Sequence, residues 1–146
     1  MSLSEDRQAI ADVVNRYAYA LDSREWTALD EVFTVDAVVR YGGPQSPPIE
    51  GREKAVAFIR SFLGGCGPSQ HLLGNHVIEV EGATAVAVCK ARVCHFGAGA
   101  RAKLAPYECF GVYRDRLRRT PEGWRIEERT FEIDLAIGDQ DILQPA

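Results

Sequence analysis

The chain has 146 residues, of which 46% are hydrophobic and 26% charged; these proportions are typical of soluble globular domains and exclude extended disorder. The length suits a single domain spanning residues 1–146, large enough to form a hydrophobic core without disulfide or metal crosslinks. The formal net charge of -4 at pH 7 argues against nucleic acid as a main partner, because proteins that bind nucleic acid usually present a basic surface.

The first predicted elements are two helices. Ser2 and Glu5 have capping-box spacing, and apolar residues then recur at i, i+3, i+4 and i+7 as far as Leu21, as on one face of an amphipathic helix. Asp22 and Ser23 are expected to end this helix and to cap a second one. The apolar face of that second helix would comprise Trp26, Leu29, Val32 and Phe33.

The remaining pattern predicts one more helix and then strands. A short strand over residues 36–41 and a loop are expected to precede a helix over residues 52–63. Two β-hairpins follow, whose strands would span residues 72–80, 85–96, 107–118 and 124–134. Helices ahead of an antiparallel sheet are typical of the α+β fold class.

The strand over residues 85–96 has one face of small side chains. Alternate residues of a strand point to the same side, and this face comprises Ala85, Ala87, Cys89, Ala91, Val93 and His95. Such a face either leaves a hollow against the helices or lets a helix pack closely, and the pattern alone favours neither.

Alternation in the neighbouring strand would put His71 and Asn75 on one face and His76 on the other. If the sheet curls around the helices, His71 and His95 would then face one pocket. A single histidine in a strand is more often structural than catalytic, but two on concave faces favour chemistry.

Other candidates also have structural explanations. Asp22 is fully explained as a helix cap, although its carboxylate could instead orient a histidine and stabilise its charge. Tyr17, Tyr19 and Tyr41 are phenols that could polarise a carbonyl or simply be buried. On an ideal helix Tyr17 and Asp22 lie about 140° apart, so both would face one pocket only if the helix ends before Asp22.

The N-terminal segment is polar and acidic, unlike a signal peptide, and no apolar stretch is long enough to cross a bilayer. We therefore expect a cytoplasmic protein with reduced thiols.

The four cysteines, Cys66, Cys89, Cys94 and Cys109, lack C-x-x-C and zinc-ligand spacing. We predict that they are unpaired residues of the core or of a cavity wall, with metal ligation as a minor alternative. Nucleotide-binding glycine motifs are also missing from the sequence.

Segments in order along nearly the whole chain resemble the SnoaL-like branch of the NTF2-like superfamily. They are residues 16–26, with Leu21-Asp22-Ser23-Arg24-Glu25-Trp26, then Leu29, Phe33, Asp36-Ala37-Val38, Gly51-Arg52, Gln70-His71-Leu72-Leu73-Gly74-Asn75 and Gly123-Trp124-Arg125-Ile126. The resemblance implies a cystatin-like cone, in which a curved antiparallel sheet wraps around the N-terminal helices and a deep pocket. It also implies a homo-oligomer, either a dimer or a trimer.

Within this branch, the pattern is similar to scytalone dehydratase and the bile-acid 7α-dehydratase. The resemblance implies that Asp22 pairs with His71, that His95 is a second catalytic histidine, and that Tyr41 is a catalytic phenol. Tyr17 precedes Asp22 by the same spacing as a tyrosine of the bile-acid enzyme.

The predicted substrate pocket comprises Leu21, Asn75, Cys89 and Cys109 beside these catalytic residues. Leu21 and Cys109 depart from the pattern, because scytalone dehydratase has a tyrosine and an asparagine at the matching positions.

We therefore predict a cofactor-independent dehydratase, a lyase acting on a cyclic or polycyclic hydroxy-carbonyl compound. His71, paired with Asp22, would remove the proton α to the carbonyl. Tyr41 or Tyr17 would stabilise the enolate oxygen. His95 would protonate the leaving hydroxyl.

Two other functions fit the same pocket: a cyclase or isomerase of polyketide-like or steroid-like substrates, and a non-enzymatic ligand-binding module. The expected partner is a small hydrophobic or aromatic molecule, with no metal, cofactor, nucleic acid or membrane.

Overall fold

The computed structural model describes residues 1–143, so the last three residues of the predicted domain lie outside the described part. In chain order the elements are α1 (Leu3–Ser23), the 3-10 helix η1 (Trp26–Glu31), β1 (Phe33–Tyr41), β2 (Ile49–Glu50), α2 (Arg52–Leu63), β3 (Ser69–Glu81), β4 (Thr84–His95), the 3-10 helix η2 (Gly99–Lys103), β5 (Tyr107–Thr120), β6 (Gly123–Ile137) and the 3-10 helix η3 (Gln140–Leu143). Within residues 1–143, no helix is long and apolar enough to span a membrane.

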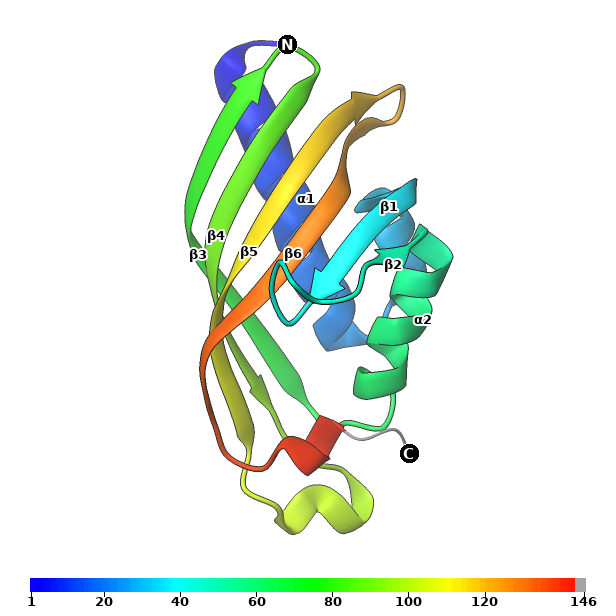
Figure 1. Cartoon of the computed structure of the whole chain (residues 1–146), viewed down its shortest axis with the longest axis vertical. Coiled ribbons are helices and arrows are strands. Elements are labelled where there is room, and N and C mark those ends of the chain that lie inside the picture. The colour runs from blue at the N-terminus through cyan, green and yellow to red at the C-terminus, as the bar shows by residue number, and fades with distance from the viewer. Residues whose placement is uncertain (144–146) are drawn as a thin grey trace.

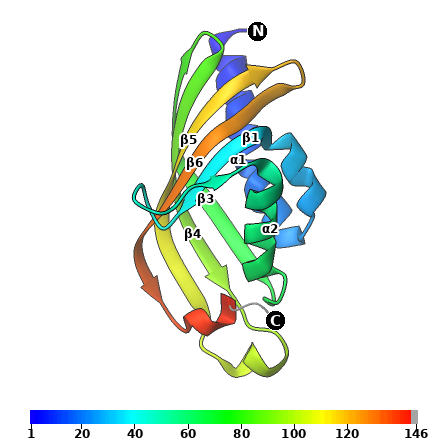
Figure 2. The same ribbon diagram turned by 45° about the vertical axis from the view of Figure 1, so that its right-hand side comes forward.

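The strands form one curved, open sheet in the order β2-β1-β6-β5-β4-β3 (Figure 1). Neighbouring strands are antiparallel except β1 and β6, which pair in parallel. α1 packs against β3 and β6 inside the curve, and α2 packs against β1 (Figure 2). The α+β prediction is confirmed, with helices on the concave face of a twisted sheet.

The predicted helix start and apolar face of α1 are confirmed. Ser2 Oγ accepts from the Glu5 backbone N–H at 3.3 Å, while Glu5 accepts from the Ser2 N–H at 2.6 Å, so the capping box forms. The apolar side chains from Ile10 to Leu21 are buried against the sheet.

The second helix is shorter than predicted. It is the 3-10 helix η1, and Phe33 already begins β1 instead of completing a helical face. η1 begins after Glu25, with no side-chain cap. The prediction that Asp22 caps this helix is therefore wrong, because α1 continues through Ser23 and Asp22 lies inside its last turn.

A β-bulge interrupts the alternation of β3. The register against β4 shifts between Gly74 and Val77, and Asn75 has a left-handed backbone with φ of 55°. Beyond the bulge the inward residues are those that strict alternation would point outward. His76 therefore lies on the helix side, where its Nε2 is 3.1 Å from Asn15 Oδ1. The prediction that His71 and His76 lie on opposite faces is wrong.

The small-residue face of β4 faces inward, as predicted, with buried residues alternating along the strand. Both alternatives that the sequence left open occur along this strand: close packing against a helix at one end and a hollow at the other. Ala85, Ala87 and Cys89 belong to the packed core, whereas Val93 and His95 line a cavity at the other end of the strand.

Candidate active site

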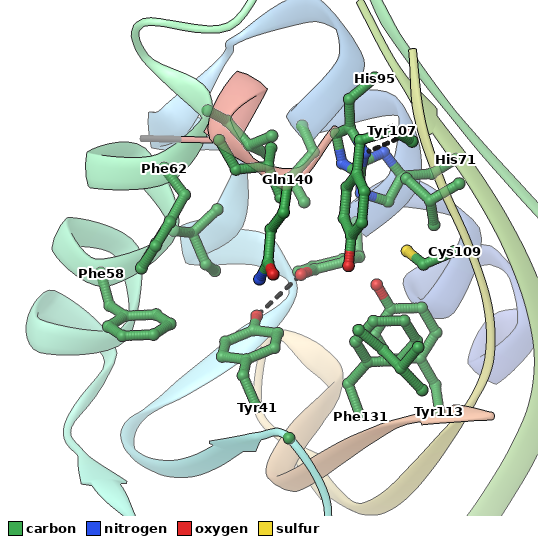
Figure 3. A pocket seen from close by; sticks show the side chains of 18 residues that line it. Tyr41, Phe58, Phe62, His71, His95, Tyr107, Cys109, Tyr113, Phe131 and Gln140 are labelled. Atoms are coloured by element: carbon green, nitrogen blue, oxygen red, sulfur yellow. Dashed lines mark hydrogen bonds between the residues drawn. The ribbon is translucent and has the colours of Figure 1, made fainter. Parts of the chain in front are cut away.

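A cavity of about 280 Å³ lies at the end of the concave face where β3 begins and β4 ends (Figure 3). Its wall comprises Tyr17, Leu21, Tyr41, Gly42, Phe58, Ile59, Phe62, Leu63, His71, Val93, His95, Tyr107, Cys109, Tyr113, Phe131, Ile133, Gln140 and Leu143. α1, α2, the inner sheet face and η3 each supply part of it. Among the described residues, the wall includes no aspartate, glutamate, lysine or arginine. The cavity is therefore an apolar and aromatic chamber with a few polar groups.

His71 projects from β3 into this cavity and is paired with Asp22 behind it. The Nδ1 atom of His71 lies 2.7 Å from Asp22 Oδ1, and the His71 backbone N–H donates to Asp22 Oδ2 at 2.8 Å. Burial raises the pKa of Asp22, but the hydrogen bonds from His71 and Ser69 lower it more, so the net shift is downward. Since an ionised carboxylate only accepts, the proton of a neutral His71 lies on Nδ1 and its Nε2 carries a free lone pair.

His95 is a neutral imidazole beside His71. The two rings meet edge to face, with centroids 5.9 Å apart. Desolvation lowers the pKa of His95 to about 4. Its Nδ1 lies 3.1 Å from the carbonyl oxygen of Tyr107, which only accepts. A neutral His95 therefore carries its proton on Nδ1, and its Nε2 is an acceptor.

Three phenols form the other polar group of the cavity wall: Tyr17 and Tyr113 are buried and Tyr41 is half-buried. The hydroxyls of Tyr17 and Tyr41 are 2.7 Å apart, and the ring of Tyr113 meets that of Tyr17 edge to face at 5.6 Å. Burial raises the pKa of each of the three phenols. All three stay protonated at neutral pH and can donate hydrogen bonds.

A buried arginine lies behind two of these phenols. Arg129 is fully buried and pairs with Asp115 through two contacts of 2.7 Å. Its guanidinium carbon lies 4.2 Å from the ring centroids of both Tyr17 and Tyr113. Desolvation lowers the pKa of Arg129 but the Asp115 carboxylate raises it more, so the net shift is upward and the group is a fixed cation.

Comparison with known proteins identifies the family of this chain. Residues 2–130 match the SnoaL-like domain. The chain belongs to the SnoaL-like family. An uncharacterised protein of Mycobacterium tuberculosis is 36% identical to this SnoaL-like domain over 132 residues, which cover 85% of this chain and 82% of that protein.

Solved structures agree with the fold. An NTF2-like protein with a cystatin-like fold from Novosphingobium aromaticivorans is 28% identical, with a TM-score of 0.73, covering 90% of this chain and 84% of that one. A proposed scytalone dehydratase from the same organism is 19% identical, with a TM-score of 0.80, covering 91% and 87%. The predicted NTF2-like, cystatin-like cone is confirmed for the SnoaL-like domain.

The predicted catalytic residues lie close together, but they do not all line the cavity. Tyr17, Tyr41, His71 and His95 line the cavity of the SnoaL-like domain, whereas Asp22 contributes no lining surface and reaches the cavity only through His71. α1 does not end before Asp22. Tyr17 and Asp22 therefore point in different directions, and β3 brings His71 between Asp22 and the cavity.

Two of the four predicted pocket residues are misplaced. Leu21 and Cys109 line the cavity as expected. Asn75 is exposed, because the β3 bulge turns it outward, and Cys89 is buried in the core further along β4. The exposed side chain of Tyr19 points away from the core face.

The cysteines of the SnoaL-like domain are unpaired. Burial raises the thiol pKa of Cys109 to about 11, so this side chain is a protonated, weakly polar part of the cavity wall. Within the described residues, no group of three or more His, Cys, Asp or Glu side chains could hold a metal ion.

Arg129 and Tyr113 contribute to the site but were not among the residues predicted from the sequence. A second bulge shifts the β5–β6 register between Arg116 and Leu117, so Ile126 and Arg129 both face inward although they are three residues apart. Strict alternation from Ile126 would have put Arg129 on the outer face. Tyr113 does follow alternation along β5, and the inward phenol could have been found from that pattern.

Proposed function

We propose that this SnoaL-like domain is a dehydratase acting on an uncharged cyclic hydroxy-carbonyl compound. The observation that carries the proposal is the His71–Asp22 pair, whose imidazole opens into a chamber walled by aromatic and aliphatic side chains. A carboxylate-supported imidazole is a general base suited to neutral pH. The likeness to a proposed scytalone dehydratase supports the same reaction class.

The first step would be removal of the proton α to the carbonyl by His71 Nε2. Asp22 holds the ring through Nδ1 and its negative charge stabilises the imidazolium that forms. Because Asp22 is also held by the His71 backbone N–H, the pair needs little rearrangement during the transfer.

Negative charge then develops on the carbonyl oxygen, and the phenols would stabilise it. Tyr17 also shares a hydrogen bond with Tyr113, so of the three hydroxyl hydrogens in this group two lie between oxygens and one is left to donate to a ligand. The cation of Arg129 behind the ring of Tyr17 favours added electron density on the phenols.

The leaving hydroxyl needs a proton, which His95 is poorly suited to supply. With a pKa near 4 and its ring proton directed at the Tyr107 carbonyl, His95 instead accepts a hydrogen bond from the substrate. The imidazolium of His71 then returns the abstracted proton to the leaving oxygen. The α carbon loses a proton, the β carbon–oxygen bond breaks, and water leaves, so one base shuttles the proton over one face of the substrate.

The cavity also restricts the substrate. Its lining carries no carboxylate, lysine or arginine among the described residues, which favours a neutral ligand. A volume of about 280 Å³ lies near the lower end of the ~300–1,000 Å³ usual for small-molecule sites. We infer a compound of one or two rings rather than one of steroid size.

A cyclase or isomerase remains the second candidate, because the same pair could move a proton without loss of water. The test is incubation with a panel of hydroxy-ketones and reduced polyphenols, followed by mass spectrometry. Loss of water that depends on His71 supports the dehydratase, whereas conversion at constant mass supports the second candidate. Binding without conversion by any compound of the panel would favour a ligand-binding module.

We also propose that the outer face of the sheet pairs with a second copy of the chain. Large apolar side chains are exposed there: Leu72 is 61% exposed, Val86 47% and Leu135 57%. Exposed apolar surface of this kind marks interaction sites. Light scattering coupled to size-exclusion chromatography would give the mass, and Leu72→Lys should lower it to that of a monomer.

A further inference from the structure

Ser69 and Arg24 extend the Asp22–His71 pair by two side chains. Ser69 Oγ lies 2.9 Å from Asp22 Oδ1, and Arg24 Nη1 lies 2.8 Å from the same serine oxygen. Because an arginine only donates, Ser69 must accept from Arg24 and direct its single hydroxyl hydrogen to Asp22. The direction of the chain is therefore fixed: Arg24 donates to Ser69, and Ser69 donates to Asp22.

Arg24 is itself held by backbone carbonyl groups. Nη1 also donates to Leu21 O at 2.6 Å, Nη2 to Gly67 O at 2.6 Å, and Nε to Leu63 O at 3.1 Å. Leu21 belongs to the last turn of α1 and Leu63 is the last residue of α2. Helix C-termini carry partial negative charge, which favours a cation there. One guanidinium thus links both helix ends to the start of β3, the strand that carries His71.

The backbone of Arg24 fits the same role. Its φ of 59° is left-handed, and its N–H bonds back to carbonyls of the last turn, which ends α1 directly after Asp22 and Ser23. Neither Arg24 nor Ser69 lines the cavity. Any effect of these two side chains on chemistry must therefore pass through Asp22 and His71.

We propose that Ser69 and Arg24 are positioning residues for His71. They hold the Asp22 carboxylate so that Oδ1 faces Nδ1 of His71, which fixes the Nδ1–H tautomer and leaves Nε2 bare in the cavity. Asp22 needs this support because its side chain is 24% exposed and, without a donor on Oδ1 besides the imidazole, water would compete for that oxygen. The effect of Ser69 and Arg24 on turnover rests on the proposed dehydratase function, whereas their effect on the tautomer of His71 does not.

The test compares Ser69→Thr with Ser69→Val, which have the same shape and differ in the hydroxyl. Both are β-branched and suit a strand. Long-range ¹H–¹⁵N spectra of the ligand-free protein report which ring nitrogen of His71 carries the proton. We expect the threonine variant to keep the wild-type Nδ1–H pattern. In the valine variant the two nitrogen signals should move toward each other, as the second tautomer becomes populated.

A His71 spectrum unchanged in Ser69→Val would overturn the proposal. If that variant does not fold, Ser69→Ala removes the hydroxyl without adding bulk. Arg24→Gln should move the same signals, and Arg52→Gln is the matched control, because Arg52 also donates to a backbone carbonyl near a helix end, that of Phe33. None of these measurements needs a substrate.

Once a substrate is known, Ser69→Val should lower kcat about tenfold with little change in KM, the effect of one hydrogen bond to a charged group. An unchanged kcat with a raised KM would mean that Ser69 only shapes the cavity, and would contradict the proposal. A tautomer shift in a protein that dehydrates nothing would refute the proposed function and leave the positioning role intact.

Discussion

Asp22 and His71 are bound to each other twice, through the imidazole Nδ1 at 2.7 Å and through the His71 backbone N–H at 2.8 Å. One of these bonds orients the ring and the other fixes the carboxylate to β3. The aspartate therefore acts on the cavity from outside it, because only the histidine lines the wall. This arrangement joins the end of α1 to the strand that carries the base.

We expect His71→Ala and Asp22→Asn each to abolish most turnover, with the histidine loss the more severe. Removing His71 removes the base, whereas Asp22→Asn keeps the shape but removes the charge and can select the wrong tautomer. Each loss should be about 10²–10⁴-fold in kcat/KM. The double variant should be little worse than His71→Ala, because the two groups act as one unit.

The measurement is kcat/KM for both single variants and the double variant, with circular dichroism as a check on folding. His76→Ala is a matched control, since His76 lies on the same strand but contacts Asn15 instead of the cavity. Activity near that of the wild type in His71→Ala would end the acid–base proposal.

Tyr41→Phe tests the phenol pair. The substitution removes the hydroxyl that lies 2.7 Å from that of Tyr17, and with it part of the donor capacity toward an enolate oxygen. We expect kcat to fall about tenfold or more. Tyr19→Phe should have no effect, because Tyr19 is 78% exposed. Equal activity of the two variants would exclude Tyr41 from the reaction.

His95 should make folding stability depend on pH. Its pKa is lowered from 6.5 to about 4 by burial, so between these values the unfolded chain binds a proton that the folded chain does not. Stability from this group is complete above pH 6.5 and is lost as the pH falls toward 4. The shift corresponds to roughly 3 kcal/mol of unfolding free energy.

Urea titrations at several pH values between 4 and 7 would measure this effect, with His95→Gln as the comparison. Asp22, whose pKa is lowered, adds a loss of the same sign at lower pH in both proteins. The variant should therefore still lose stability at low pH, but less steeply. Parallel curves would show that His95 does not titrate as its burial implies.

How far the sequence predicts this molecule depends on whether local patterns continue unbroken. The face of α1 and the small-residue face of β4 follow from periodicity, so the concave core and the positions of His71 and His95 could be predicted. Periodicity fails where the register shifts, as at the β3 bulge and at the bulge opposite Arg116 and Leu117. Gly74-Asn75 carries a usable signal, because an isolated glycine in a strand suggests a bulge and asparagine tolerates a left-handed φ. No comparable residue marks the bulge that turns Arg129 inward.

For Asp22 the sequence pattern is intact, but it does not reveal the partners of the side chain. As the first of two polar residues after an apolar helix face, it has the sequence features of a cap, and capping explains it without reference to any distant residue. Its actual partners, His71 and Ser69, are nearly fifty positions away and come within reach only when β3 crosses the end of α1. Only the family resemblance pointed to that pairing.

The buried ion pair between Arg129 and Asp115 should make the stability of the fold sensitive to loss of either charge. Both side chains are almost completely buried, at 0% and 1% exposure. Asp115→Asn would leave a buried cation without its counter-charge, which typically costs about 3–5 kcal/mol. We therefore expect a large fall in the denaturant midpoint. Asp36→Asn is the matched control, because Asp36 pairs with Arg118 at the surface, where both partners are solvated and the stability should hardly change.

A double variant separates the contribution of Arg129 to the fold from its electrostatic effect on the cavity. Replacing both partners, as Arg129→Met with Asp115→Leu, removes the charges without leaving either unpaired and should recover much of the stability. It cannot recover the positive field behind Tyr17 and Tyr113, whose rings lie 4.2 Å from the guanidinium. We expect this double variant to fold and to dehydrate slowly. Full activity in a stable double variant would mean that Arg129 supports the fold alone.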